Sequence, residues 1–154
     1  MTSRFATAVH ILGMLAVEEQ RSPGGSTCSR EIAESICTHP VVVRKVMAEL
    51  QRAGIIETRR GAGGGARLAR SASDITLRQV YDSVGRDEVL FTTPPGGPNK
   101  KCSVAPHINT WLVSLFNDIE EVLKSRLDEI TLCRLQGTIL SQMAKCCGGE
   151  IEEH

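Results

Sequence analysis

The chain has 154 residues, of which 41% are hydrophobic and 23% charged, values that are ordinary for a globular domain with a real core. Aromatic residues make up 3%, which disfavours a single-stranded nucleic-acid platform built from stacked rings. The net charge is zero, but residues 1–86 hold 12 Lys and Arg against 8 Asp and Glu, whereas residues 87–154 hold 6 against 10. An anionic partner is therefore expected to bind the first part.

The sequence also bears on location and on the cysteines. No apolar run follows basic residues at the start, and no stretch approaches ~18 consecutive apolar residues, so we expect neither a signal peptide nor a membrane span. This pattern predicts a cytoplasmic protein whose six cysteines are thiols. No pair is spaced as C-x-x-C, so we predict no metal site of the zinc-ribbon kind.

The first predicted helix covers residues 4–19, with Ser3 or Thr2 as its cap. Its apolar residues recur every three or four positions, as in a helix with one buried face. They are Phe5, Ala8, Val9, Leu12, Leu15 and Ala16. The glycine-containing loop 21–26 then separates this helix from the next one.

Two helices joined by a tight turn are predicted over residues 29–36 and 40–53. Cys28 stands at a capping position, with Glu31 three residues later. Thr38 in the turn is the expected N-cap of the second helix. Pro40 suits the first turn of that helix, where a missing N–H costs nothing. The order is that of a helix-turn-helix.

The second of these helices has two different faces. Val43, Val46, Met47 and Leu50 share a face that should pack inward. The remaining surface carries Thr38, His39, Val41, Val42, Arg44 and Lys45. Such groups at a helix N-terminus suit base edges, thymine methyls and phosphates, although a merely solvated helix face has the same pattern.

A glycine-tipped β-hairpin is predicted after Gly54, with strands over residues 55–60 and 66–70 and a tip over 61–65. Four arginines flank the tip: Arg59, Arg60, Arg67 and Arg70. Glycine amides can approach a phosphate closely, and arginines can enter a minor groove. A nucleotide-binding loop is excluded because the Gly-Lys-Ser/Thr ending is missing.

The rest of the chain is predicted to be helical around one long loop. Thr76 and Gln79 form a capping box for a helix to Val84, and residues 87–101 contain the loop TTPPGGP. A long amphipathic helix over residues 104–129 has an apolar stripe broader than one small domain needs, which is typical of dimers. A last helix over 132–145 precedes a frayed tail.

The predicted fold class is therefore mainly α with a small β-hairpin: a winged helix-turn-helix domain plus a long C-terminal dimerisation helix. The predicted divisions are residues 1–86 for DNA binding, 87–103 for a sensor linker, 104–145 for dimerisation and 146–154 for a flexible tail.

Nearly the whole chain resembles the Rrf2 family of winged helix-turn-helix regulators. The motifs that carry the resemblance are SRFATAVHIL, EIAESICTHPVVVRKVMAELQRAGIIETRRGAGGGARLA, ITLRQVYDSV, CSVAPHI and LDEITL. The resemblance implies a homodimer that binds partly palindromic operator DNA, usually as a repressor, with no enzymatic activity.

The resemblance also assigns roles by position. DNA-contacting residues would be Ser3, Arg4, Thr38, His39, Pro40, Val42, Lys45, Arg59, Arg60, Gly63, Gly64 and Gly65. The dimer interface would be formed by Ile108, Leu112, Leu115, Ile119, Val122 and Leu123. The loop before the long helix would hold a signal site.

Family members with an iron–sulfur cluster carry three closely spaced cysteines in that loop, whereas this chain has Cys102 alone. A cluster normally needs four ligands, so we predict no cofactor and take thiol oxidation as the signal, with an iron–sulfur cluster or a small molecule as the alternatives. Cys102 follows two lysines and precedes a helix, which favours a reactive thiol. Cys37 and Cys133 are predicted to be small buried residues.

Parts of the sequence also suit two other classes of function. A Cys102–His107 nucleophilic pair would suit an enzyme, but no orienting carboxylate or oxyanion hole is evident, so we expect no enzyme. A winged helix used for protein contact would bind an acidic partner, and binding to genomic DNA fragments distinguishes that alternative.

Overall fold

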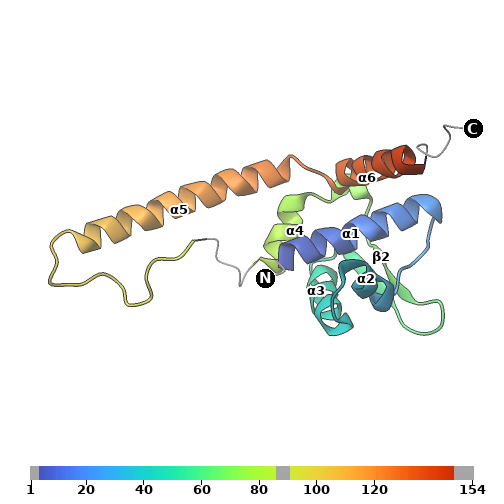
Figure 1. Cartoon of the computed structure of the whole chain (residues 1–154), viewed down its shortest axis with the longest axis horizontal. Coiled ribbons are helices and arrows are strands. Elements are labelled where there is room, and N and C mark those ends of the chain that lie inside the picture. Colours follow the sequence, from blue (N-terminus) through green and yellow to red (C-terminus); the bar gives the residue numbers. More distant parts are fainter. Residues whose placement is uncertain (1–3, 86–90, 148–154) are drawn as a thin grey trace, which may run out of the picture.

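The computed structural model describes residues 4–85 and 91–147 (Figure 1). Its elements are α1 (Arg4–Arg21), α2 (Ser29–Ile36), α3 (Pro40–Arg52), β1 (Ile56–Arg59), β2 (Gly65–Leu68), the 3-10 helix η1 (Ala72–Asp74), α4 (Leu77–Val84), α5 (Ala105–Asp128) and α6 (Leu132–Cys147). The mainly helical fold with one antiparallel hairpin confirms the predicted class. None of these helices is long and apolar enough to cross a membrane.

Helix α1 lies at the centre of the core. Its predicted stripe is confirmed, with Ala8, Leu12 and Ala16 fully buried. Around it pack α3, α4, α6 and β2, so these four elements share one supporting helix. Each fully buried Leu or Ile side chain contributes about 1.5–3 kcal/mol.

The turn between α2 and α3 is closed by backbone bonds. Cys37 adopts a left-handed conformation with φ of 57°, which lets the Thr38 N–H reach the Ala33 carbonyl at 2.9 Å. The predicted Thr38 cap is wrong, because α3 begins at Pro40 and His39 directly precedes it. His39 Nδ1 accepts the Val41 N–H at 3.2 Å and takes the capping role.

The hairpin is shorter than predicted, and the rest of the domain holds it in place. Its register pairs Ile56 with Leu68 and Arg59 with Gly65, so the strands stop where the glycine-rich turn begins. Thr27, in the loop before α2, pairs with Ala66 through N–H···O bonds of 3.0 and 2.9 Å. The loop 22–27 thus adds a short bridge to the hairpin.

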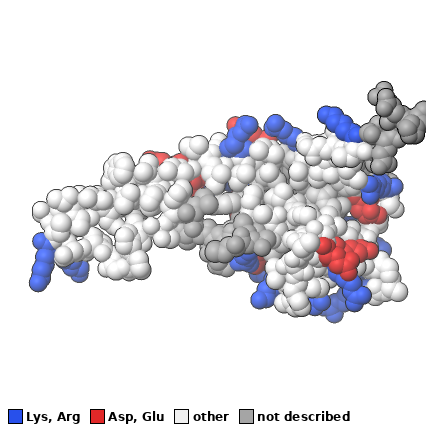
Figure 2. All heavy atoms as spheres, in the orientation of Figure 1, with Lys and Arg blue, Asp and Glu red and all other residues white. Residues whose placement is uncertain are grey.

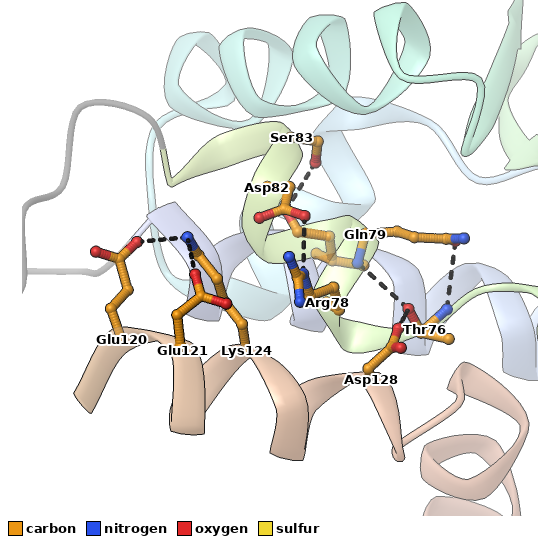
Figure 3. Close-up of polar contacts among 10 residues, drawn as sticks. Thr76, Arg78, Gln79, Asp82, Ser83, Glu120, Glu121, Lys124 and Asp128 are labelled. Carbon is orange, nitrogen blue, oxygen red and sulfur yellow. Dashed lines mark hydrogen bonds and ion pairs between the residues drawn. The ribbon is translucent and has the colours of Figure 1, made fainter. Parts of the chain in front are cut away.

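Helix α5 joins this domain through its C-terminal end, as Figure 3 shows. The Thr76 hydroxyl caps α4 by accepting the Gln79 N–H at 3.3 Å, and donates to Asp128 Oδ1 at 3.2 Å. The backbone of Ile75 and Leu77 bonds to residues 130 and 132 at 2.8–2.9 Å. These contacts form a corner from which α6 returns to pack on α1.

The other end of α5 extends far from the domain, where it follows the segment 91–104 (Figure 1). Phe91 stacks on Phe116 with ring centroids 5.2 Å apart, which holds the segment against α5. Several apolar side chains of α5 are strongly exposed, including Trp111 at 63% and Val122 at 71%.

Candidate nucleic-acid interface

The two predicted faces of α3 are confirmed by burial. Val43, Val46, Met47 and Leu50 are 7% exposed or less and pack on the core. Val41 and Val42 are 45% and 42% exposed, and Arg44 and Lys45 are exposed beside them. Since the inward face anchors the helix firmly, its outward and N-terminal surface is presented on a rigid support.

The N-terminus of α3 presents a small mixed surface. His39 is exposed, whereas Thr38 and Pro40 are half-buried. Because His39 Nδ1 is committed to the cap, Nε2 is the ring nitrogen left for an outside partner. Backbone N–H groups at a helix start and a nearby Lys45 suit an anion such as a phosphate.

In the hairpin, two of the four arginines are committed to internal contacts. Arg67 forms an ion pair with Glu57 across the strands. Arg70, just after β2, donates to the Gly54 carbonyl and to Gln79 Oε1, both at 3.3 Å, and so links the end of α3 to α4. Arg59 and Arg60 are exposed and form no ion pair within the described residues.

Two glycines of the tip, Gly64 and Gly65, are required by close backbone approach, whereas Gly61 and Gly63 have positive φ angles of 98° and 72°. A Cβ on Gly64 would lie 2.4 Å from the Arg59 carbonyl oxygen, and one on Gly65 would lie 2.6 Å from that of Thr27. Ser26 Oγ also donates to the Gly63 carbonyl at 3.2 Å. The tip is therefore compact and tied to the loop before α2, and its largest side chain is the methyl group of Ala62.

The positive charge of this end is visible in Figure 2, where Lys and Arg side chains gather along the lower edge of the molecule. In the same orientation, α3 and the hairpin lie in that lower part (Figure 1). Arg4, one of the predicted phosphate contacts, forms an ion pair with Glu49 and so joins α1 to α3. Ser3 lies outside the described residues.

Cys102 lies at the opposite end, in the segment before α5. Backbone N–H groups of Val104 and then Ala105 donate to its sulfur and lower the pKa of the thiol, because they stabilise the thiolate. The side chain is exposed and therefore accessible to small reagents.

The prediction that Cys37 and Cys133 are buried is wrong, because both are exposed. Cys37 occupies the turn after α2 rather than the inward face of that helix. Cys133 follows the fully buried Leu132 on α6, and neighbouring positions of a helix point in different directions.

Sequence reasoning missed the contacts that position the hairpin from outside it. The bridge between Thr27 and Ala66 joins residues that are 39 positions apart in the sequence, and neither segment has a pattern that predicts the pairing. The sequence also did not predict the two hydrogen bonds of Arg70, because nothing in the sequence distinguishes this arginine from the other three of the hairpin.

Comparison with known proteins identifies the family. Residues 1–137 match the Rrf2 model, described as an iron-dependent transcriptional regulator. The HTH-type transcriptional regulator YwnA of Bacillus subtilis is 35% identical over 127 residues, covering 82% of this chain and 90% of YwnA. The regulator IscR of Vibrio atlanticus is 30% identical, covering 88% of this chain and 73% of IscR.

The fold has a counterpart among solved structures. The global cysteine regulator CymR of Bacillus subtilis superposes with a TM-score of 0.61 at 20% identity, covering 90% of this chain and 96% of CymR. The family match over most of the chain, the fold and the helix-turn-helix with its hairpin all agree. The chain belongs to the Rrf2 family of DNA-binding transcriptional regulators.

Proposed function

We propose that the protein is a homodimeric repressor that binds partly palindromic operator DNA. The observation that carries the proposal is the outward N-terminal surface of α3 beside a glycine-tipped hairpin with two exposed arginines. Thr38, His39, Pro40, Val42 and Lys45 would meet the major groove. Arg59, Arg60 and the amides of residues 63–65 would meet the adjacent backbone and minor groove, with Ser3 and Arg4 near phosphates.

The exposed apolar stripe of α5 supports the dimer. Ile108, Ile119 and Val122 are 52%, 40% and 71% exposed in the single chain, and such a stripe is normally covered by a partner helix. The proposed interface is formed by Ile108, Leu112, Leu115, Ile119, Val122 and Leu123. A twofold dimer would place two α3 helices in successive major grooves, about 34–36 Å apart.

The DNA-contact assignment is tested by two substitutions and one control. Lys45→Ala should weaken binding to every DNA sequence and reduce the salt slope by about two, because one phosphate contact is lost in each protomer of the dimer. Val42→Ala should instead lower the preference for the operator over random DNA. Arg134→Ala removes an exposed cation of α6 and should change neither quantity. Equal effects from all three variants would exclude α3 as the DNA-contacting helix.

The proposed signal is oxidation of Cys102 in the sensor linker, residues 87–103. A peroxide would take two electrons from the thiolate, giving a sulfenic acid and hydroxide. The lowered pKa and exposure of Cys102 support this step. Cys102→Ser should bind the operator as the parent protein does and keep that affinity after peroxide treatment. A normal response of this variant to peroxide would remove Cys102 from the mechanism.

An iron–sulfur cluster does not fit the donor set present here. Cys102 is the one cysteine between residues 87 and 131, and the described residues contain no group of three His, Cys, Asp or Glu able to hold a metal ion. A cluster normally needs four ligands with soft sulfur preferred. The absorbance spectrum of anaerobically purified protein tests this conclusion, because a bound cluster absorbs visible light.

The proposed arrangement follows the chain: DNA binding by residues 1–86, sensing by 87–103, dimerisation by 104–145 and a tail over 146–154. A cytoplasmic site of action suits this proposal, since operator DNA is found there and thiols stay reduced until an oxidant arrives.

A further inference from the structure

The outward face of α3 has the same spacing as its buried face. The buried side uses positions 43, 46, 47 and 50. Two positions earlier in each case stand the exposed residues Val41, Arg44, Lys45 and Ala48. Because two residues span about 200° around a helix, the two sets lie on opposite sides of α3. Val41 therefore occupies the outward face at the first turn, whereas Val42, about 100° further round, lies between the two faces.

The outward face of α3 offers cations and small apolar groups, because the acid and the amide of this helix are committed elsewhere. Glu49 forms an ion pair with Arg4 of α1. Gln51 Oε1 accepts the Thr58 hydroxyl at 3.1 Å, near the other end of α3. In the major groove an amide side chain reads adenine and a carboxylate reads cytosine, whereas an apolar group contacts the methyl of thymine. The first turn of α3 is therefore suited to thymine.

His39 places a hydrogen-bond donor beside Val41. The His39 ring accepts the Val41 N–H at Nδ1 over 3.2 Å, and a neutral imidazole that accepts there carries its proton on Nε2. The ring is exposed at the start of the helix. Thymine presents its O4 acceptor next to its methyl group on the major-groove edge. The donor and the isopropyl group thus suit two neighbouring groups of the same base.

We propose that Val41 is a specificity-determining residue whose side chain contacts the methyl group of a thymine in each operator half-site. The inference rests on the proposed function, because it requires α3 to enter the major groove. It adds Val41, the valine at the centre of the outward face, to the DNA-contacting residues assigned above.

The test starts from duplexes that the full-length protein enriches from a random-sequence pool. Each thymine of the selected half-site is replaced in turn by deoxyuridine, which removes the methyl group and keeps O4. At one position this change should weaken binding about fourfold for each half-site, as expected for one methyl group that is buried on binding. Changing both half-sites should weaken binding about sixteenfold, since distant contributions add as free energies.

Two protein variants assign the sensitive methyl group to a side chain. Val41→Ala should bind the thymine and deoxyuridine duplexes equally, because the group that meets the methyl is gone. Val113→Ala is the matched control, since Val113 of α5 is 43% exposed, against 45% for Val41, and lies outside α3. This control should keep the fourfold ratio of the parent protein. Circular dichroism checks that both variants keep the fold.

The outcomes separate this inference from the proposed function. An enriched palindrome in which no thymine is sensitive to the loss of its methyl would overturn the inference and leave the proposed function in place. A Val41→Ala variant that keeps the parent's ratio would also overturn it, because the methyl would then meet another residue. A pool without any enriched sequence would overturn the proposed function, and this inference with it.

Discussion

Cys37 occupies a backbone position that favours glycine. Its φ of 57° places it in the left-handed region, where a Cβ is strained, and the turn from α2 to α3 depends on this conformation. The Thr38 N–H reaches Ala33 only because the chain reverses here. The orientation of α3 relative to α2 therefore requires a strained backbone conformation at Cys37.

Replacing this residue should stabilise the protein. Cys37→Gly should raise the free energy of unfolding by about 0.5–1 kcal/mol, since relief of strain outweighs the added freedom of the unfolded chain. Cys37→Ala is the control, because it removes the thiol and keeps the strained Cβ. Urea denaturation measures both. A gain for alanine equal to that for glycine would mean that the thiol, and not the backbone, is responsible.

The lowered pKa of Cys102 makes a prediction about pH. Since hydrogen bonds from Val104 and Ala105 favour the thiolate, alkylation by iodoacetamide should reach its half-maximal rate at a lower pH in the folded protein than in urea. The linked stability is fully present above the ordinary thiol pKa and is lost as the pH falls through the lowered one. A variant with Cys102 as its single cysteine isolates the signal, and identical pH profiles in both states would contradict the assignment.

At the scale of elements, the hairpin depends on its contact with the loop before α2. Gly65→Ala would place a Cβ 2.6 Å from the Thr27 carbonyl, so the bridge between Thr27 and Ala66 should open. We expect a stability loss of about 1–3 kcal/mol and a larger relative loss of operator affinity. Gly96→Ala is the matched control, because nothing lies within 4 Å of its Cβ position. Equal thermal unfolding of the two variants would show that the bridge is unimportant.

Local patterns predicted the elements of this fold well. Apolar periodicity located α1, α3 and α5, and the Thr76–Gln79 box located the start of α4. The helix caps were predicted less well. Thr38 was the expected N-cap of α3, whereas His39 directly precedes Pro40 and occupies that position. The exposure of Cys37 and Cys133 escaped prediction because cysteine suits buried and exposed positions alike.

The candidate site was also predicted only in part from the sequence. The outward side of α3 and the glycine tip follow from local sequence, because helical period and glycine content are local properties. The local sequence does not show which arginines remain available to DNA. Glu57 binds Arg67, and Gly54 and Gln79 bind Arg70, through contacts that form only in the tertiary structure.

For the whole molecule, the exposed side of α5 should carry dimerisation. Val122→Glu introduces a charge at a side chain that is 71% exposed in the single chain, so the protomer should keep its fold while the dimer dissociates at least tenfold more readily. Asn117→Glu, on the opposite side of the helix, is the control. Sedimentation equilibrium measures both, and unchanged association of the Val122 variant would place the interface elsewhere.

The most direct test of the central claim is the salt dependence of binding to a palindromic segment from the protein's own promoter, compared with random DNA. If each protomer neutralises three phosphates, log K should fall against log salt with a slope of about −5. The palindrome should bind about a thousandfold or more tighter than random DNA at the same salt. Equal affinity for the two DNAs, or an affinity independent of salt, would contradict the claim that α3 and the hairpin recognise an operator.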